Sequence, residues 1–229
     1  MQDLFKQINQ TLHQTMTIPV FCSLGTLCHS ANLLKRNGWK HCSYPFDWIF
    51  SSPDSVIHCL DDNFTTFLDR SFFVDGGHDK CGHTFYYPCG KTMFNHKNPL
   101  KNDADYQYYV RCVDRFRALL RQPEHKVFTM MWINLPQENV SRDKADIIEQ
   151  VKRLRSALLR KTNNFEFLVI FHYPDASEPF HSFFQVEEDD ATDGIIQCLE
   201  LRTRTWSKGV VFHDDRDNDY FDEVLKKRY

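Results

Sequence analysis

The pattern of apolar and polar positions predicts a chain of alternating strands and helices. Two runs, Val127–Leu135 and Phe165–Phe171, are apolar at successive positions, as expected for strands that are covered on both faces. A third strand is predicted at Ile18–Ser23. Asp103–Arg121 and Lys144–Lys161 place apolar residues at helical spacing, with charged residues between them. Strands and helices in this order predict a layered α/β core.

Shorter segments complete this prediction. Helical spacing predicts helices at 3–15, 28–37, 53–60 and 217–228, and residues 64–68 predict a second short helix or an apolar turn. Short apolar runs predict strands at His41–Tyr44, Ser182–Val186, Ile195–Arg202 and Gly209–His213. Residues 71–100 differ, because turns with glycine separate short aromatic runs and so indicate an antiparallel insert. We expect one domain over residues 1–229: a layered mixed sheet flanked by helices, with this small insert at about 71–100.

Composition and charge exclude several classes of protein. The chain has 229 residues and a formal net charge of −3, and no basic stripe stands out, so we expect no nucleic-acid partner. No apolar run approaches the roughly 18 residues of a membrane span, so no membrane partner is expected either. The first residues lack the continuous apolar centre of a signal peptide, which favours a cytoplasmic location. In that reducing compartment the eight cysteines would be thiols, not disulfides.

Cys28 is the candidate nucleophile that the residues themselves suggest. It follows a predicted strand and a Ser-Leu-Gly turn, and it opens a predicted helix that ends near Asn37-Gly38. The unpaired N–H groups and the dipole of a helix start favour a thiolate, and they can also hold an oxyanion. The alternative is a small buried hydrophobic residue, which is the commoner role of cysteine.

Other residues compete for a chemical role. His172 and His213 each end a predicted strand, where α/β proteins often place functional groups, and Asp214-Asp215 follows His213. Five possible zinc ligands gather in the insert: His78, Cys81, His83, Cys89 and His96. Their spacing is irregular and the chain has no C-x-x-C pair, so we expect no metal site and no cofactor.

The chain resembles a papain-like cysteine peptidase family of unknown function, which occurs in bacteria and large DNA viruses. The elements that carry the resemblance are Ser23-Leu24-Gly25 with Cys28, Tyr44-Pro45-Phe46-Asp47-Trp48, Phe94-Asn95-His96, Tyr109-Val110-Arg111 and Asp114-Arg115-Phe116. They span about residues 18–120, and the C-terminal half carries no matching motif.

The resemblance implies a catalytic constellation. Cys28 would be the nucleophile, His96 the general base and Asp47 the group that orients the base. Ser23, Phe46 and Trp48 would contribute to binding. Asp47 also has a structural interpretation, in which a buried carboxylate accepts backbone N–H bonds and locks the turn after Pro45. A papain-type fold has a helical half and an antiparallel barrel half, whereas the strands and helices after residue 125 favour a layered sheet.

We therefore predict a cysteine-dependent hydrolase that acts on peptide or isopeptide bonds, with a protein, peptide or glycoconjugate as substrate. One alternative is a non-catalytic binding or assembly module on the same fold. Another is a transferase that modifies acyl groups or glycans.

Overall fold

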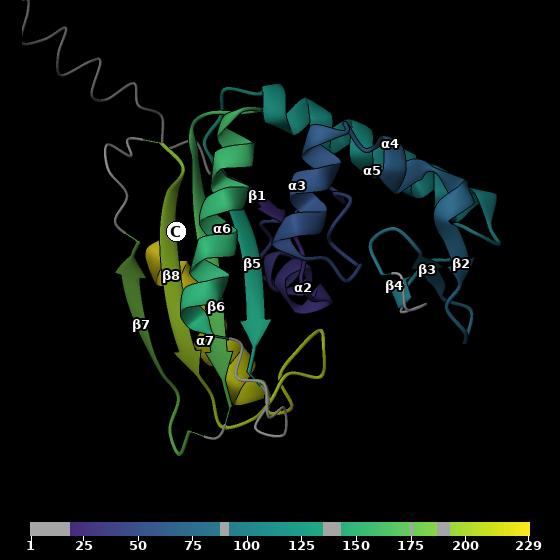
Figure 1. Cartoon of the computed structure of the whole chain (residues 1–229). Helices are drawn as coiled ribbons and strands as arrows, with labels where there is room; N and C mark the ends of the chain where they lie inside the picture. The colour runs from purple at the N-terminus through teal and green to yellow at the C-terminus, as the bar shows by residue number, and fades with distance from the viewer. Residues whose placement is uncertain (1–18, 88–91, 135–142, 175, 187–192) are drawn as a thin grey trace, which may run out of the picture.

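The structure, a computed structural model, describes residues 19–87, 92–134, 143–174, 176–186 and 193–229. Seven helices and eight strands are assigned there, one of the helices a 3-10 turn (Figure 1). The helices are α2 (Cys28–Arg36), α3 (Pro53–Asp61), α4 (Thr65–Leu68), η1 (Arg70–Phe72), α5 (Asp103–Arg121), α6 (Lys144–Leu159) and α7 (Asp215–Arg228). The strands are β1 (Val20–Ser23), β2 (Phe73–Asp75), β3 (Cys81–His83), β4 (Thr92–Phe94), β5 (Lys126–Ile133), β6 (Phe165–Tyr173), β7 (Phe180–Gln185) and β8 (Ile195–Arg202).

The main sheet has the strand order β1-β5-β6-β8-β7. β1, β5, β6 and β8 are parallel, and β7 pairs antiparallel to β8 at the edge. The smaller sheet is antiparallel, with the order β2-β3-β4. This arrangement confirms the predicted mixed sheet flanked by helices with a small antiparallel insert at about 71–100.

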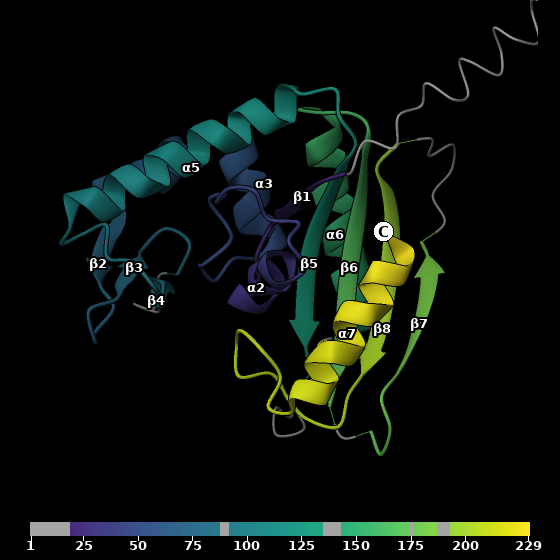
Figure 2. The ribbon, with the colours of Figure 1, turned by 180° about the vertical axis from the view of Figure 1, so that it is seen from behind.

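Helices cover both faces of the main sheet, so side chains alternate between two apolar clusters. Along β6, Phe167, Val169 and Phe171 belong to the larger cluster, together with apolar residues of α3, α5 and α6. Leu168 and Ile170 belong to the second cluster, with residues of α2 and α7. Figures 1 and 2 show α3 and α6 on one side of the sheet and α7 on the other. This burial on both faces explains why the central strands are apolar at successive positions.

Two predicted strands are wrong. His41–Tyr44 forms no strand, because the N–H of Tyr44 donates to the Asp47 carboxylate instead of to a neighbouring strand. Gly209–His213 is a loop with one isolated bridge, and buried Phe212 donates its N–H to the side chain of Asn218. In both segments a local side-chain acceptor replaces the hydrogen bonds of a sheet.

The remaining long elements lie where the periodicity predicted them, within two residues at each end. The predicted helix at 3–15 lies outside the described residues. A single domain over residues 1–229 therefore stays a prediction. No helix among the described ranges is long and apolar enough to cross a membrane.

Candidate active site

Cys28 is the first residue of α2 and lies just beyond the carboxyl end of β1. The residue before it, Leu27, takes the N-cap position in an extended conformation, and no side chain caps the helix start. Cys28 itself is buried, with 3% of its surface exposed. The strand, turn and helix start are therefore those that the sequence predicted.

The turn between β1 and α2 is held by a serine from a distant segment. Ser51 Oγ accepts the N–H of Thr26 at 2.9 Å and donates to the carbonyl of Leu24 at 2.8 Å. Gly25 has a φ of +89°, and a Cβ there would meet Ser51 Oγ at 2.1 Å. Thr26 also has a positive φ, of 67°, which costs free energy for a β-branched residue. Ser51 thus ties the turn between β1 and α2, which precedes Cys28, to the segment that follows Phe46-Asp47-Trp48.

Ser23 stabilises the same turn from inside. Its Oγ lies 2.7 Å from Ser30 Oγ and accepts the N–H of Gly25 at 3.1 Å. Ser23 is fully buried, so the structure gives it a contact within the turn. Its predicted role in binding stays a prediction.

Asp47 is buried and fastens the turn that follows Lys40. One of its oxygens forms an ion pair with the Lys40 ammonium and accepts the N–H of Tyr44 at 2.8 Å. Burial raises the pKa of the Asp47 carboxyl to about 6, and the nearby Lys40 charge opposes this rise. These contacts are the ones expected of a structural lock. None of the hydrogen bonds that Asp47 makes with described residues reaches an imidazole.

The two aromatic neighbours of Asp47 differ. Phe46 is fully buried in the larger cluster, where its ring contacts Phe64, Phe67 and Phe116. Trp48 is half-buried and meets the ring of His96 edge-to-face, with 5.8 Å between the centroids. Of these two aromatic side chains, Trp48 is therefore the one in contact with the predicted base.

Pairing with β4 brings this histidine to Trp48. The N–H of Phe50 donates to the carbonyl of Met93 at 3.0 Å, and Ile49 forms an antiparallel bridge with Phe94. His96 follows β4 by two residues and its side chain is exposed. The structure thus brings the three motifs that contain Cys28, Asp47 and His96 together. Ser51 holds the turn before Cys28, and residues 49–50, which follow the Asp47 motif, pair with β4 just before His96.

The thiol of Cys28 is protonated in this state. Burial raises the pKa of Cys28 to about 11; its own N–H lowers the pKa, and the charge of Asp47 raises it. The burial effect therefore outweighs the helix start, which was expected to favour the thiolate. In the described part of the chain, Cys28 forms no hydrogen bond with an imidazole, so no preformed thiolate–imidazolium pair is present.

Tyr109 lies on α5, and burial is the main reason why the pKa of its phenol is raised; electrostatic effects of its neighbours, Cys28 the smallest of them, act in the same direction. The hydroxyl is buried and has no hydrogen-bond partner among the described residues. In the sequence, Tyr109 is interpreted only as an apolar position of a helix, although it belongs to one of the motifs that carry the family resemblance. A buried neutral donor without a partner among the described residues is a candidate for contact with a ligand.

The other histidines lie elsewhere. His172 is buried at the end of β6, where Nε2 lies 2.7 Å from Thr203 Oγ1, and burial lowers its pKa to about 3. His213 is exposed and contacts the ring of Trp206, while Asp214 accepts the N–H of Arg216 as the cap of α7. Neither histidine hydrogen-bonds to Cys28 within the ranges that the structure covers.

The possible zinc ligands do not come together in the part of the chain that is described. No group of three or more histidine, cysteine or acidic side chains there could hold a metal ion. His83 is instead stacked against Phe72, and its Nε2 lies 3.1 Å from the carbonyl oxygen of Thr66. Cys89 lies outside the described residues.

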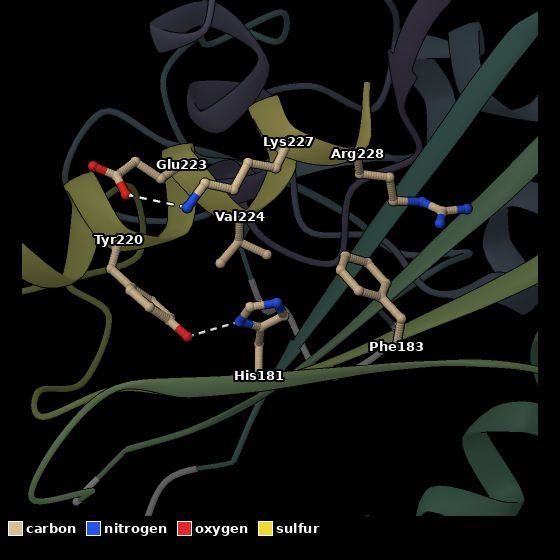
Figure 3. A pocket seen from close by; sticks show the side chains of 7 residues that line it. All are labelled: His181, Phe183, Tyr220, Glu223, Val224, Lys227 and Arg228. Carbon is tan, nitrogen blue, oxygen red and sulfur yellow. Dashed lines mark hydrogen bonds and ion pairs between the residues drawn. The ribbon is translucent and has the colours of Figure 1, made fainter.

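In the described part of the chain, two cavities flank the main sheet. One, of about 530 Å³, opens beside the turn that precedes Cys28 and is lined by Thr26, Ser51 and Trp132 among others. The second, of about 350 Å³, lies between α7 and the edge strand β7 (Figure 3).

Several polar groups that line the second cavity already have partners. His181 Nδ1 lies 2.7 Å from the hydroxyl of Tyr220, and Lys227 is paired with Glu223 at 3.8 Å (Figure 3). Arg228 donates to Glu166 at 3.1 Å. Because its cationic groups already have partners, we interpret this cavity as part of the packing interface between α7 and the sheet.

Comparison with known proteins yields one match. Residues 19–175 match a family model described as "Putative papain-like cysteine peptidase (DUF1796)". The matched range includes Cys28, Asp47 and His96. No curated protein and no solved structure matches this chain.

Proposed function

This chain belongs to the family of putative papain-like cysteine peptidases, and on that premise we propose that it hydrolyses peptide or isopeptide bonds through Cys28. The observation that carries the proposal is the position of Cys28 at the start of α2, where no side chain caps the helix. N–H groups at such a position can stabilise the oxyanion that forms when a thiol attacks a carbonyl. The hydroxyl of Tyr109 would be a second donor.

The proposed reaction proceeds through a thioester. Sγ of Cys28 attacks the carbonyl carbon while its proton passes to the imidazole of His96. The imidazolium then protonates the leaving amine, and the C–N bond breaks. Water then attacks the thioester carbonyl while His96 takes a proton from it; the C–S bond breaks, and the imidazolium returns the proton to the departing thiolate of Cys28. The pKa of about 11 for Cys28 requires such a general base. Catalytic hydrogen bonds are often long before substrate binds, so the base would approach the thiol in the complex.

Asp47 supports the reaction indirectly in this proposal. It holds the segment that carries Trp48, and Trp48 in turn contacts His96. Phe46 anchors the same segment in the core. The substrate would be a protein, a peptide or a glycoconjugate.

A thiol-reactive peptide electrophile tests the nucleophile. We expect Cys28 to label faster than the other seven cysteines near neutral pH, and we expect His96→Ala to slow that labelling. His172→Ala and His213→Ala are the matched controls and should leave the labelling rate unchanged. Equal labelling of Cys28 and the other cysteines, mapped by mass spectrometry, would show that Cys28 is not a nucleophile.

A non-catalytic binding or assembly module is the second candidate, and one observation favours it. The carboxylate of Asp47 is committed to Lys40 and to the backbone of Tyr44, as a structural lock requires. If the chain is such a module, Cys28→Ser should leave its function intact. If the chain is the proposed hydrolase, Cys28→Ser should abolish hydrolysis.

A further inference from the structure

We propose that the cavity of about 530 Å³ beside the nucleophile turn binds the side chain of a lysine or arginine in a peptide. The inference rests on the proposed function, since it names the substrate class of that site. Thr26 lines the cavity and precedes Cys28 by two residues, so an occupant of the cavity lies next to the nucleophile turn.

The position of the cavity is one at which open α/β sheets bind ligands. β1 and β5 are parallel neighbours, and their carboxyl ends meet at the same edge. The helix after β1, α2, contributes to the cluster on one face, and the helix after β5, α6, contributes to the cluster on the other. Loops that diverge to opposite faces leave a crevice between them, which is the usual place for a ligand in such sheets.

The charge of the cavity favours a cation. Asp143 and Asp146, at the start of α6, line the cavity, and the described residues that line it include no lysine, arginine or histidine. The starts of α3 and α6 also face it, and each contributes roughly half a positive charge. Two full negative charges exceed about one positive charge, so the described residues of the cavity carry a net charge of about −1.

These carboxylates remain available to a ligand. Asp143 uses Oδ1 to accept the N–H of Ala145 at 2.9 Å, and this bond leaves Oδ2 for another donor. Asp146 forms no ion pair with any residue of the described ranges. The cavity between α7 and β7 differs in this respect, because Lys227, Glu223 and Arg228 already have ion-pair partners.

The remaining lining suits a long aliphatic arm. Trp132, Tyr87 and Ile147 present apolar surface, against which the methylene groups of lysine or arginine can pack. Trp132 is only 4% exposed, and its indole N–H has no hydrogen-bond partner among the described residues. That N–H can donate to a backbone carbonyl of the bound peptide. Gln150 adds an amide oxygen as a further acceptor.

Binding is measured directly on the full chain that carries Cys28→Ser, so that turnover does not interfere. The probes are four acetylated tripeptide amides of one design, with lysine, arginine, norleucine or glutamate at the centre. Isothermal titration, or ligand-detected NMR for weak binding, gives each affinity. We expect the lysine and arginine peptides to bind about tenfold more tightly than the norleucine peptide, and high salt to reduce this preference.

Variants assign the effect to the cavity. Asp143→Asn keeps the helix cap, and both it and Asp146→Asn should weaken binding of the lysine peptide about two- to fivefold, as exposed ion pairs do. Gln150→Arg should abolish the preference. Glu149→Gln is the matched control, because Glu149 lies on the same helix, pairs with Lys152 and does not line the cavity.

The outcomes separate this inference from the proposed function. Equal binding of the lysine and norleucine peptides, or no effect of the two aspartate substitutions, refutes the inference. Equal binding of free 1,5-diaminopentane and the lysine peptide refutes the assignment to a peptide. If Cys28 labels selectively while the lysine preference is absent, the inference fails and the hydrolase stands. If the lysine preference is present and Cys28 does not label selectively, the hydrolase fails and the binding site stands.

Discussion

Acidification from about pH 7.5 to about pH 5 is expected to destabilise the fold through two buried histidines, His29 and His172. His29 lies on α2, where its Nδ1 is 2.7 Å from Ser207 Oγ, and its Nε2 has no partner among the described residues. Nε2 of His172 lies 2.7 Å from Thr203 Oγ1. Both rings lie 4.6 Å from the ring of Phe212, measured between centroids. Burial is the main reason why the pKa of each falls from 6.5 to about 3.

The direction and the size of the effect follow from these shifts. Because the folded pKa is lower, the unfolded chain binds more protons between about pH 6.5 and pH 3, and stability falls as the pH falls through this window. Each unit below 6.5 removes about 1.4 kcal/mol for each histidine, which gives about 2 kcal/mol at pH 5, or about 4 for the pair. Asp47 acts in the opposite direction, since its raised pKa of about 6 stabilises the folded state on acidification by about 1 kcal/mol.

Urea denaturation at both pH values measures this loss. The double variant His29→Asn and His172→Gln places an amide near each hydrogen-bonding nitrogen without a group that titrates in this range. We expect the wild type to lose about 4 kcal/mol more than this variant between the two pH values. His41→Gln, at an exposed position, is the control and should keep the wild-type loss. An equal loss in wild type and double variant would refute the burial of these imidazoles.

Three further substitutions test the turn, the lock and the unpaired hydroxyl. Gly25→Ala should destabilise the chain by about 3 kcal/mol, because the new Cβ would lie 2.1 Å from a serine hydroxyl at a φ of +89°. Asp47→Asn should cost about 3 to 5 kcal/mol, since the mostly buried Lys40 ammonium would lose its counter-charge. Tyr109→Phe should leave stability unchanged or slightly higher, because the lost hydroxyl has no partner among described residues, yet it should slow the proposed hydrolysis.

Matched variants control these measurements, which use urea denaturation and, for Tyr109, peptide turnover. Gly38→Ala also has a positive φ but open space around its Cβ, so it should cost only about 1 kcal/mol. Asp54→Asn removes an exposed ion pair with Arg153 and should cost less than about 1 kcal/mol. Equal losses of stability in the two glycine variants would contradict the close contact of Gly25 with Ser51. Equal losses in the two aspartate variants would contradict the structural role of the buried Asp47–Lys40 pair. A loss of 2 kcal/mol or more in Tyr109→Phe would show that its hydroxyl has a partner.

The sequence by itself determined the elements and the layers. Strands such as Phe165–Tyr173 are apolar at successive positions because both faces of the sheet are covered, and this pattern is visible without coordinates. The helix start at Cys28 and the helix at Asp103–Arg121 are likewise local, since turn residues and helical periodicity specify them. The two wrongly predicted strands, at residues 41–44 and 209–213, are segments in which a side chain several residues away accepts a backbone N–H: Asp47 that of Tyr44, and Asn218 that of Phe212.

Only the tertiary structure decided the environment of each chemical group. The sequence placed a thiol at a helix start, which favours ionisation, but packing buried it, and desolvation then raised its pKa to about 11. Likewise, the Asp47 carboxylate could have faced a histidine, and it pairs with Lys40 instead because the turn folds back on itself. Ser51 contacts Thr26 in the turn before Cys28, and the cavity between α3 and α6 likewise joins residues that are far apart in the chain. Periodicity reports local structure, whereas burial and partner choice depend on which distant segments meet, so these features required the fold.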